Sequence, residues 1–343
     1  MKFLLTTNIG IEDIVEKEIK ENFKAKVFPK FLGLQGRDLI ETNEKNLEKI
    51  LKLRSIYHVI KYIGNFEIET SLKGLQDIYE KIKRIEIEDL EKAETFRVTS
   101  ERIGEHAFTS VQVQKFAGQA LVEKYERKVD LKNFDVNVIV DVIGSKCFVG
   151  IQLTRESLHK RFERPFNHPA AIKAPLAYAM LRLAELKEGE VLLDPFCGGA
   201  TLPIEAAQVW DGKIKIFASD ISKKYLRGAE ANAKAGKVKK YIKFKLADAR
   251  KLDEFYNFEI DKIVTNPPYG VRMLKRKNLK PLYKKFLISA SRVLSKEGRI
   301  VIINLKANSF RHLIFETKKF NILHERVVET GGLYPHIFVL EKM

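Results

Sequence analysis

Residues 171–305 alternate regularly between helix-like and strand-like segments, and this alternation restricts the fold more than any other feature of the chain. The expected strands cover 191–194, 214–219, 241–246, 261–265 and 299–305. The expected helices cover 171–186, 201–210, 222–235 and 280–294. Such a pattern is typical of a mostly parallel sheet with helices on both faces, and strands at 319–329 and 336–341 are expected to add an antiparallel edge.

The first 153 residues mix helices and strands less regularly. One group contains strand-like residues 2–7, a helix from about Ile11, strand-like runs near 26–32 and 56–63, and a periodic segment at 44–53. A second group contains helices 72–84 and 109–126 and strands 95–99, 135–143 and 147–153. Residues 154–170 are highly charged and contain two prolines, as connectors between domains often do. We therefore expect α+β modules at 1–68 and 69–153, a linker at 154–170 and the alternating domain at 171–343.

The charge balance favours a polyanionic partner. The chain has 62 Lys and Arg against 45 Asp and Glu, which gives a formal charge of +17, and residues 161–343 carry +16 of it. A lysine-rich solvated surface would produce the same balance, so charge alone leaves both interpretations open.

Disulfides, metals and membranes are not expected. Cys147 and Cys197 are the only cysteines, too few for a disulfide framework and not spaced as zinc ligands. No stretch approaches the ~18 apolar residues that cross a bilayer, and the first residues do not resemble a secretory signal. We expect a cytoplasmic, metal-free protein that acts as a monomer.

A tight turn follows the first strand of the alternating domain. The strand VLLD ends at Asp194 and continues into PFCGGAT before a helix, and glycines at this point let a ligand approach the backbone. The turn is not a P-loop, because Lys and Ser/Thr do not follow the glycines in the required order, and it fits GxGxxG poorly. The sequence therefore predicts a ligand here that is neither a P-loop nucleotide nor a nicotinamide cofactor.

Two later acids fit the same pocket. Asp220 ends the strand KIFASD, where a carboxylate can accept hydrogen bonds from both ribose hydroxyls of a nucleoside. Asp248 ends IKFKLAD, where it could accept from an adenine amino group. Each acid alone is better explained as a helix cap or loop residue, but one at each strand end favours a nucleoside site.

The most informative motif is Asn266-Pro267-Pro268-Tyr269, which follows the fourth strand of the domain. Two prolines hold the loop extended and leave its carbonyls free to accept. A nucleobase amine has its lone pair delocalised into the ring, so an enzyme that methylates it must favour the pyramidal form by accepting from both hydrogens. The Asn266 side-chain oxygen and the Pro267 carbonyl are candidate acceptors, and Tyr269 offers a face for stacking an extruded base. The Pro-Pro dipeptide alone would indicate only a turn.

A basic run follows this loop without an acid in VRMLKRKNLKPLYKK. We expect Arg272, Lys275, Arg276 and Lys277 to contact nucleic-acid phosphates, with a solvated helix start as the alternative. Lys160, Arg161 and Arg164 in the connector are interpreted in the same way, although linkers are commonly charged. His159 and His168 are interpreted as structural, because nothing in the sequence orients them.

Taken together, Asp194-Pro-Phe-Cys-Gly-Gly, Asp220, Asp248 and Asn266-Pro-Pro-Tyr resemble the motifs of S-adenosylmethionine-dependent amino-methyltransferases of nucleic-acid bases. With the upstream modules and the connector LHKRFERPFNHPAAIK, the whole chain is similar to the THUMP-containing RNA methyltransferases. The ending GGLYPHIFVLEK is most similar to the archaeal branch that forms N2-methylguanosine at position six of tRNA. The resemblance implies an N-terminal ferredoxin-like domain, a THUMP domain and a Rossmann-like, seven-stranded α/β methyltransferase domain.

The resemblance also implies roles for individual residues. The implied cofactor-binding residues are Asp194, Phe196, Cys197, Gly198, Gly199, Asp220, Ile221, Asp248, Ala249 and Asn266. The implied catalytic residues are Asn266, Pro267, Pro268 and Tyr269, and the implied partner is tRNA. We interpret the Cys197 thiol as a packing group, because amine methylation needs no covalent enzyme adduct.

Departures from the family pattern keep alternatives open. The family turn more often reads Gly-Ser-Gly, so Ala200 must adopt a conformation that tolerates its Cβ. Enzymes that act at tRNA position ten typically carry Asp where this chain has Asn266, which favours position six without excluding position ten or ribosomal RNA. A catalytically silent RNA-binding protein and a DNA adenine-N6 methyltransferase remain as alternatives.

Overall fold

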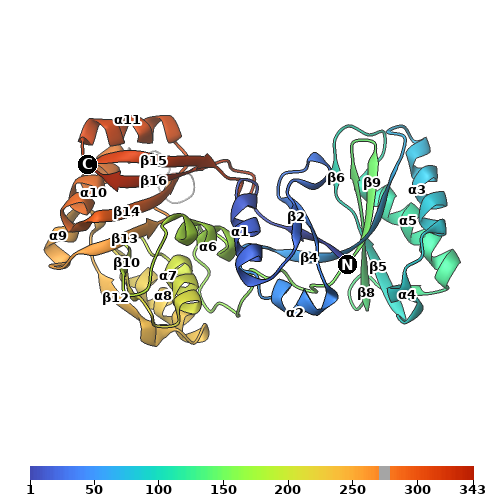
Figure 1. Cartoon of the computed structure of the whole chain (residues 1–343), viewed down its shortest axis with the longest axis horizontal. Coiled ribbons are helices and arrows are strands. Elements are labelled where there is room, and N and C mark those ends of the chain that lie inside the picture. The colour runs from blue at the N-terminus through green and yellow to red at the C-terminus, as the bar shows by residue number, and fades with distance from the viewer. Residues whose placement is uncertain (270–278) are drawn as a thin grey trace. The chain divides into compact units, whose positions relative to one another are not determined.

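The computed structural model describes residues 1–269 and 279–343 and divides the chain into two compact units (Figure 1). One unit contains residues 1–6 and 19–158, and the other contains residues 7–18 and 159–343. Each unit has its own sheet and hydrophobic core. The first helix, α1 (Glu12–Asn22), contributes residues to both units.

The unit that contains residues 19–158 is built on a nine-stranded sheet in the order β2-β3-β1-β4-β9-β8-β5-β7, with β6 paired to β8. Its strands are β1 (Lys2–Thr6), β2 (Lys26–Phe28), β3 (Arg37–Glu41), β4 (His58–Glu67), β5 (Thr95–Thr99), β6 (Arg102–Ile103), β7 (Lys128–Val129), β8 (Val136–Ile143) and β9 (Lys146–Gln152). Its α-helices are α2 (Leu47–Ile50), α3 (Lys73–Arg84), α4 (Glu88–Glu91) and α5 (Ser110–Tyr125).

The first four strands have the predicted ferredoxin-like arrangement. They follow the chain order β-α-β-β-α-β, and β1 lies between β3 and β4 with antiparallel pairing on both sides. The sheet then continues from β4 to β9, so one sheet runs across the predicted module boundary at 68/69. The exact module boundaries stay a prediction.

Helices α3 and α5 cover one face of the second half of this sheet (Figure 1). In α3, Leu75, Ile78 and Ile82 recur at helical spacing and are buried, so its apolar stripe faces the sheet. Helix α5 begins at a capping box in which Thr109 and Gln112 exchange side-chain and backbone hydrogen bonds. These signals explain why both helices could be predicted from the sequence.

The unit that contains residues 159–343 holds, in its described part, a seven-stranded sheet in the order β12-β11-β10-β13-β14-β16-β15. Its strands are β10 (Val191–Asp194), β11 (Lys215–Asp220), β12 (Ile242–Leu246), β13 (Ile260–Thr265), β14 (Leu294–Asn304), β15 (Phe320–Val327) and β16 (His336–Lys342). The first five strands are parallel, and β15 and β16 form an antiparallel edge. The predicted Rossmann-like α/β fold is therefore confirmed.

Helices lie on both faces of this sheet (Figure 1). They are α6 (Ala174–Leu183), α7 (Thr201–Trp210), α8 (Lys223–Ala235), α9 (Leu252–Phe255), α10 (Lys280–Val293) and α11 (Ala307–Thr317). The first three share one core cluster with residues Ile11 and Ile14, and the last three share a second cluster. The sequence analysis did not predict α11, although its buried residues Ala307, Phe310 and Ile314 have helical spacing.

Candidate active site

A cavity of about 510 Å³ lies at the carboxyl ends of the parallel strands. The loops that follow β10, β11, β12 and β13 all contribute to its walls. Strand β10 neighbours both β11 and β13, so the strand order reverses at this point. Open α/β sheets bind ligands at such a reversal, and the volume suits a small molecule, for which pockets of roughly 300–1,000 Å³ are usual.

The predicted cofactor residues lie together at this edge of the sheet. Those that line the cavity are Phe196, Gly198, Asp220, Ile221, Asp248, Ala249 and Asn266. Asp194, Cys197 and Gly199 line an adjoining cavity of about 30 Å³, which Gly198 and Asn266 also border. The structure thus brings all of the predicted cofactor residues to two adjoining cavities, and their roles in binding stay predictions.

Asp194 is a buried carboxyl group at the end of β10, with 2% of its surface exposed. Its Oδ1 accepts hydrogen bonds from the Thr265 hydroxyl at 2.7 Å and from the Phe196 amide at 3.2 Å. Burial raises the pKa of Asp194 from 3.8 to about 7, although the Thr265 hydrogen bond opposes the rise. The carboxyl group therefore ties the ends of β10 and β13 together beside the cavity.

This raised pKa predicts a pH-dependent stability. The folded protein binds the Asp194 proton more tightly than the unfolded chain, so this contribution to the free energy of unfolding is largest below pH 3.8 and is lost as the pH rises to about 7. In Asp194→Asn the group cannot titrate, while its side-chain oxygen still accepts from Thr265. Urea unfolding from pH 4 to 7 should show wild-type stability falling relative to Asp194→Asn. A constant difference across this range would contradict the predicted pKa.

The turn after β10 approaches the cavity closely. Gly198 has φ +50°, and a Cβ there would lie 3.3 Å from the His168 ring. The expectation that Ala200 adopts a conformation that tolerates its Cβ is wrong: Ala200 has φ 61°, in the left-handed region that favours glycine. Burial raises the pKa of the Cys197 thiol well above its usual value, so the thiol stays protonated and is a poor nucleophile.

The two acids that follow β11 and β12 have different surroundings. Asp220 accepts from the backbone amides of Gly198 at 3.0 Å and Ser222 at 2.9 Å, and burial raises its pKa. The Asp248 carboxylate pairs with Arg250, whose Nε lies 2.9 Å from each oxygen, and this hydrogen bonding lowers its pKa. Both carboxylates line the cavity, so each can offer a further lone pair to a ligand.

The Asn266 side chain is held on both sides. Its Nδ2 donates to the Ala170 carbonyl at 3.0 Å, which orients the amide so that Oδ1 is the opposite end. The Tyr269 hydroxyl donates to this Oδ1. Because Asn266 lines the cavity, its Oδ1 also has a lone pair available to a second donor there. The Asn266 side-chain amide therefore has a fixed orientation and lies beside the turn that follows β10.

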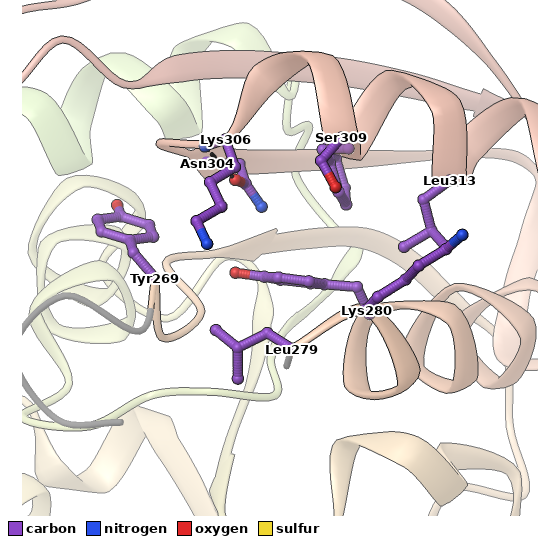
Figure 2. Close-up of a pocket in the computed structure, with 9 residues that line it drawn as sticks. Tyr269, Leu279, Lys280, Asn304, Lys306, Ser309 and Leu313 are labelled. Atoms are coloured by element: carbon purple, nitrogen blue, oxygen red, sulfur yellow. Dashed lines mark hydrogen bonds between the residues drawn. The ribbon is translucent and has the colours of Figure 1, made fainter. Parts of the chain in front are cut away.

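The remaining residues of the motif that begins at Asn266 border two different pockets. Pro267 and Pro268 line the large cavity, and the Pro268 carbonyl accepts from the Tyr283 hydroxyl at 2.7 Å. Tyr269 does not line that cavity among the described residues. It borders a separate, smaller pocket (Figure 2) and packs against the core. The predicted stacking role of Tyr269 stays a prediction, and the described geometry places its hydroxyl on Asn266 instead.

The connector is docked onto the unit that contains residues 159–343 through Asn232 of α8. This side chain is fully buried, accepts from the Phe166 amide at 3.0 Å and donates to the carbonyls of Phe166 at 2.9 Å and Gly199 at 3.0 Å. A Cβ at Gly228 would lie 2.3 Å from the Phe166 ring, so glycine is needed there for the ring to pack. Asn232 therefore links the connector to the cofactor turn.

Replacing Asn232 with alanine is expected to lower the free energy of unfolding by about 1–3 kcal/mol, because buried backbone groups lose their partners. We also expect weaker binding of S-adenosylhomocysteine, since the Gly199 carbonyl loses its anchor. Asn137→Ala is the matched control, as this buried asparagine lies in the other unit. Urea unfolding and calorimetry would measure both quantities. Equal cofactor affinity in the two variants would contradict the link.

The predicted RNA-binding residues differ in their surroundings. Arg161 forms an ion pair with the buried Glu205 at 3.2 Å, and Arg164 donates to the Thr201 hydroxyl at 2.8 Å. These contacts lie within the unit and hold the connector, whereas Lys160 is exposed. Arg272, Lys275, Arg276 and Lys277 lie outside the described residues. A role in RNA binding stays a prediction for all seven.

Sequence reasoning missed several residues that shape the site. His168 was interpreted as structural, yet its ring lines the large cavity, and burial lowers its pKa. Ala170 and Tyr283 hold the loop that follows β13 through hydrogen bonds to Asn266 and Pro268. No motif marks these positions, because the contact between Ala170 and Asn266 joins residues 96 apart in the chain.

In the described part of the chain, no group of three or more His, Cys, Asp or Glu residues is arranged to hold a metal ion. The helices of residues 1–269 and 279–343 include none with the length and apolar character needed to cross a bilayer.

Comparison with family models places two known domains on the chain. A THUMP domain matches residues 73–152, and an RMKL-like methyltransferase domain matches residues 161–336. The second match includes every residue of the two cavities at the strand ends.

Similarity to curated proteins extends over nearly the whole chain. A protein of Archaeoglobus fulgidus named tRNA (guanine(6)-N2)-methyltransferase is 32% identical, with 99% of this chain and 92% of the relative covered. A protein of the same name from Thermus thermophilus is 34% identical, with 98% of both chains covered. The crystal structure of TrmN from Thermus thermophilus matches with a TM-score of 0.83 at 34% identity, and covers 100% of this chain and 99% of that one.

Proposed function

Since the chain belongs to the RMKL-like methyltransferase family and carries a THUMP domain, we propose that it methylates the N2 amine of guanosine at position six of tRNA. The observation that carries the proposal is the Asn266 amide, oriented by Ala170 beside a cavity of about 510 Å³ that the cofactor turn also borders. Relatives named for this reaction match almost the full length of the chain.

The residues of the cavity suit S-adenosylmethionine. Gly198 gives a backbone surface without a side chain, and Asp220 and Asp248 offer carboxylates at neighbouring strand ends for the ribose and the adenine. When bound, this cofactor supplies a methyl group on a positively charged sulfur, which is already a reactive donor. The protein mainly has to hold the acceptor and exclude water.

The loop residues would prepare the amine. The Asn266 Oδ1 and the Pro267 carbonyl accept the two hydrogens of the guanine amine, which favours the pyramidal form with a localised lone pair. With the amine held in this form, the bound cofactor would supply the methyl group for the new N–C bond, and the amine would release one proton to solvent. For its Oδ1 to accept from the amine, Asn266 either shares that oxygen with the Tyr269 hydroxyl or exchanges one donor for the other.

The proposal also covers the RNA contacts, the oligomeric state and the cellular location. We place the enzyme in the cytoplasm as a monomer, with the exposed Lys160 and the basic residues after the loop on the RNA. The THUMP domain favours RNA over duplex DNA, and it would grip the acceptor end of the tRNA. Light scattering on the purified protein would measure its molar mass and so test whether it is a monomer.

The test is to map the methyl group. Incubation of unmodified tRNA with cofactor that carries a labelled methyl, followed by nuclease digestion and mass spectrometry, should yield labelled N2-methylguanosine in the fragment that contains position six. Label at position ten or in ribosomal RNA would support the corresponding alternative. Label only in adenines of duplex DNA would contradict the proposal, and so would cofactor binding without transfer to any nucleic acid.

A further inference from the structure

A second pocket lies beside the loop that contains Tyr269, between the start of α10, the end of β14 and the start of α11 (Figure 2). Its volume is about 90 Å³, and Tyr269 forms one wall. This is well below the roughly 300 Å³ of the smallest usual ligand pockets and close to the space of about three water molecules, at about 30 Å³ each. The pocket therefore suits a single small polar group rather than a nucleobase or a second cofactor.

The chemistry of the walls favours an anion. The described lining contains two lysines, Lys280 and Lys306, together with Ser309 and Asn304, and it contains no carboxylate. Lys280 lies 3.1 Å from Glu316, an acid that it shares with Lys284. Lys306 makes no ion pair with any described residue. Figure 2 shows its side chain extending from the start of α11 toward Tyr269.

A hydrogen bond anchors the backbone of Lys306, and a second hydrogen bond links the pocket to the loop that contains Asn266 and Pro268. The Lys306 amide donates to the Oδ1 of buried Asn304 at 2.8 Å, which anchors the residue at the end of β14. Tyr283, which also lines the pocket, donates to the Pro268 carbonyl at 2.7 Å. A group bound at Lys306 would therefore have a defined position relative to the loop that holds the target base.

We propose that this pocket receives one backbone phosphate of the RNA strand next to the target guanosine, with Lys306 as the cation that binds it. The inference rests on the proposed function. An extruded nucleotide keeps its flanking phosphates near the mouth of the site, and such contacts fix the register of the strand without reading its sequence. Consecutive residues of one short loop border the two pockets, with Pro267 and Pro268 lining the large cavity and Tyr269 lining the small one, so a base in the first and a phosphate in the second would lie along the same loop.

Lys306→Gln tests the proposal, because neutralising one phosphate contact changes the salt dependence of binding. Titration of unmodified tRNA into the full chain with S-adenosylhomocysteine, over a range of salt concentrations, gives the slope of log K against log salt. We expect Lys306→Gln to reduce that slope by about 0.7–0.9 and to weaken binding about 5–8-fold at 100 mM salt. Lys306→Arg should keep the wild-type slope.

Lys296→Gln is the matched control, because Lys296 is an exposed lysine near the opposite end of the same strand, β14. It removes the same charge and should leave the slope unchanged. Equal slopes in the two glutamine variants, in a protein that still methylates tRNA, would overturn the phosphate pocket and leave the proposed function intact. A wild-type protein that neither binds nor methylates tRNA would overturn both.

Discussion

Asn266→Ala is expected to lower kcat for tRNA methylation by about 10²–10³-fold, the usual cost of removing one oriented group that acts on the reacting atoms. The variant loses the side-chain oxygen that, in the proposed mechanism, accepts from the guanine amine, so the amine would stay planar and its lone pair delocalised. The affinity for S-adenosylhomocysteine should be unchanged, since the cofactor turn and both acids remain. Single-turnover kinetics with saturating cofactor, together with calorimetry, would measure the two quantities.

Two further variants make this result specific. Asn266→Asp keeps an acceptor oxygen but cannot donate to the Ala170 carbonyl, so it should retain more activity than Asn266→Ala. Asn308→Ala removes an exposed amide from α11 of the same unit and should leave turnover unchanged. Equal turnover in wild type and Asn266→Ala would refute the role of this side chain.

Asp220→Ala is expected to raise the dissociation constant of S-adenosylhomocysteine by about 100-fold. This is about 2.7 kcal/mol, within the range for hydrogen bonds to a charged group. The carboxylate would lose its bonds to the ribose hydroxyls, and the Gly198 amide would lose the acceptor that fixes the cofactor turn. Calorimetric titration of the intact chain would measure the change.

Asp261→Ala is the control that distinguishes a loss of cofactor affinity from a general loss of stability. Asp261 also accepts a backbone hydrogen bond, from the Val191 amide at 2.8 Å, but it lies near the amino ends of the strands, away from the cavity. The variant should unfold more readily and still bind the cofactor normally. Similar losses of affinity in both aspartate variants would show that Asp220 acts only through the fold.

Much of the fold could be predicted because its signals are local. The alternation of strands and helices in residues 171–305 indicated the parallel sheet, and the position of Pro-Pro after the fourth strand indicated that this loop borders the cavity at the strand ends. Strand β3 was missed because it has only three buried positions, one of which is Asp38. A charged residue within a short strand weakens the apolar pattern on which such predictions depend.

The surroundings of the site could not be predicted, because they depend on distant contacts. The charged connector has the composition of a solvated linker, yet Arg161 pairs with buried Glu205 and Asn232 holds the connector at Phe166. The position of the Tyr269 hydroxyl on Asn266 also depends on loop geometry that a four-residue motif does not specify. Local sequence thus indicated which groups could act, and tertiary packing decided how they are oriented.

The most direct test of the account uses tRNA in which inosine replaces guanosine at position six. Inosine lacks only the N2 amino group, so the strand, its phosphates and the rest of the base are retained. We expect full methylation of the guanosine transcript and no methyl transfer to the inosine transcript, with unchanged binding of S-adenosylhomocysteine. Methylation of the inosine residue itself would mean that the Asn266 loop does not act on the N2 amine, and would refute the proposed function.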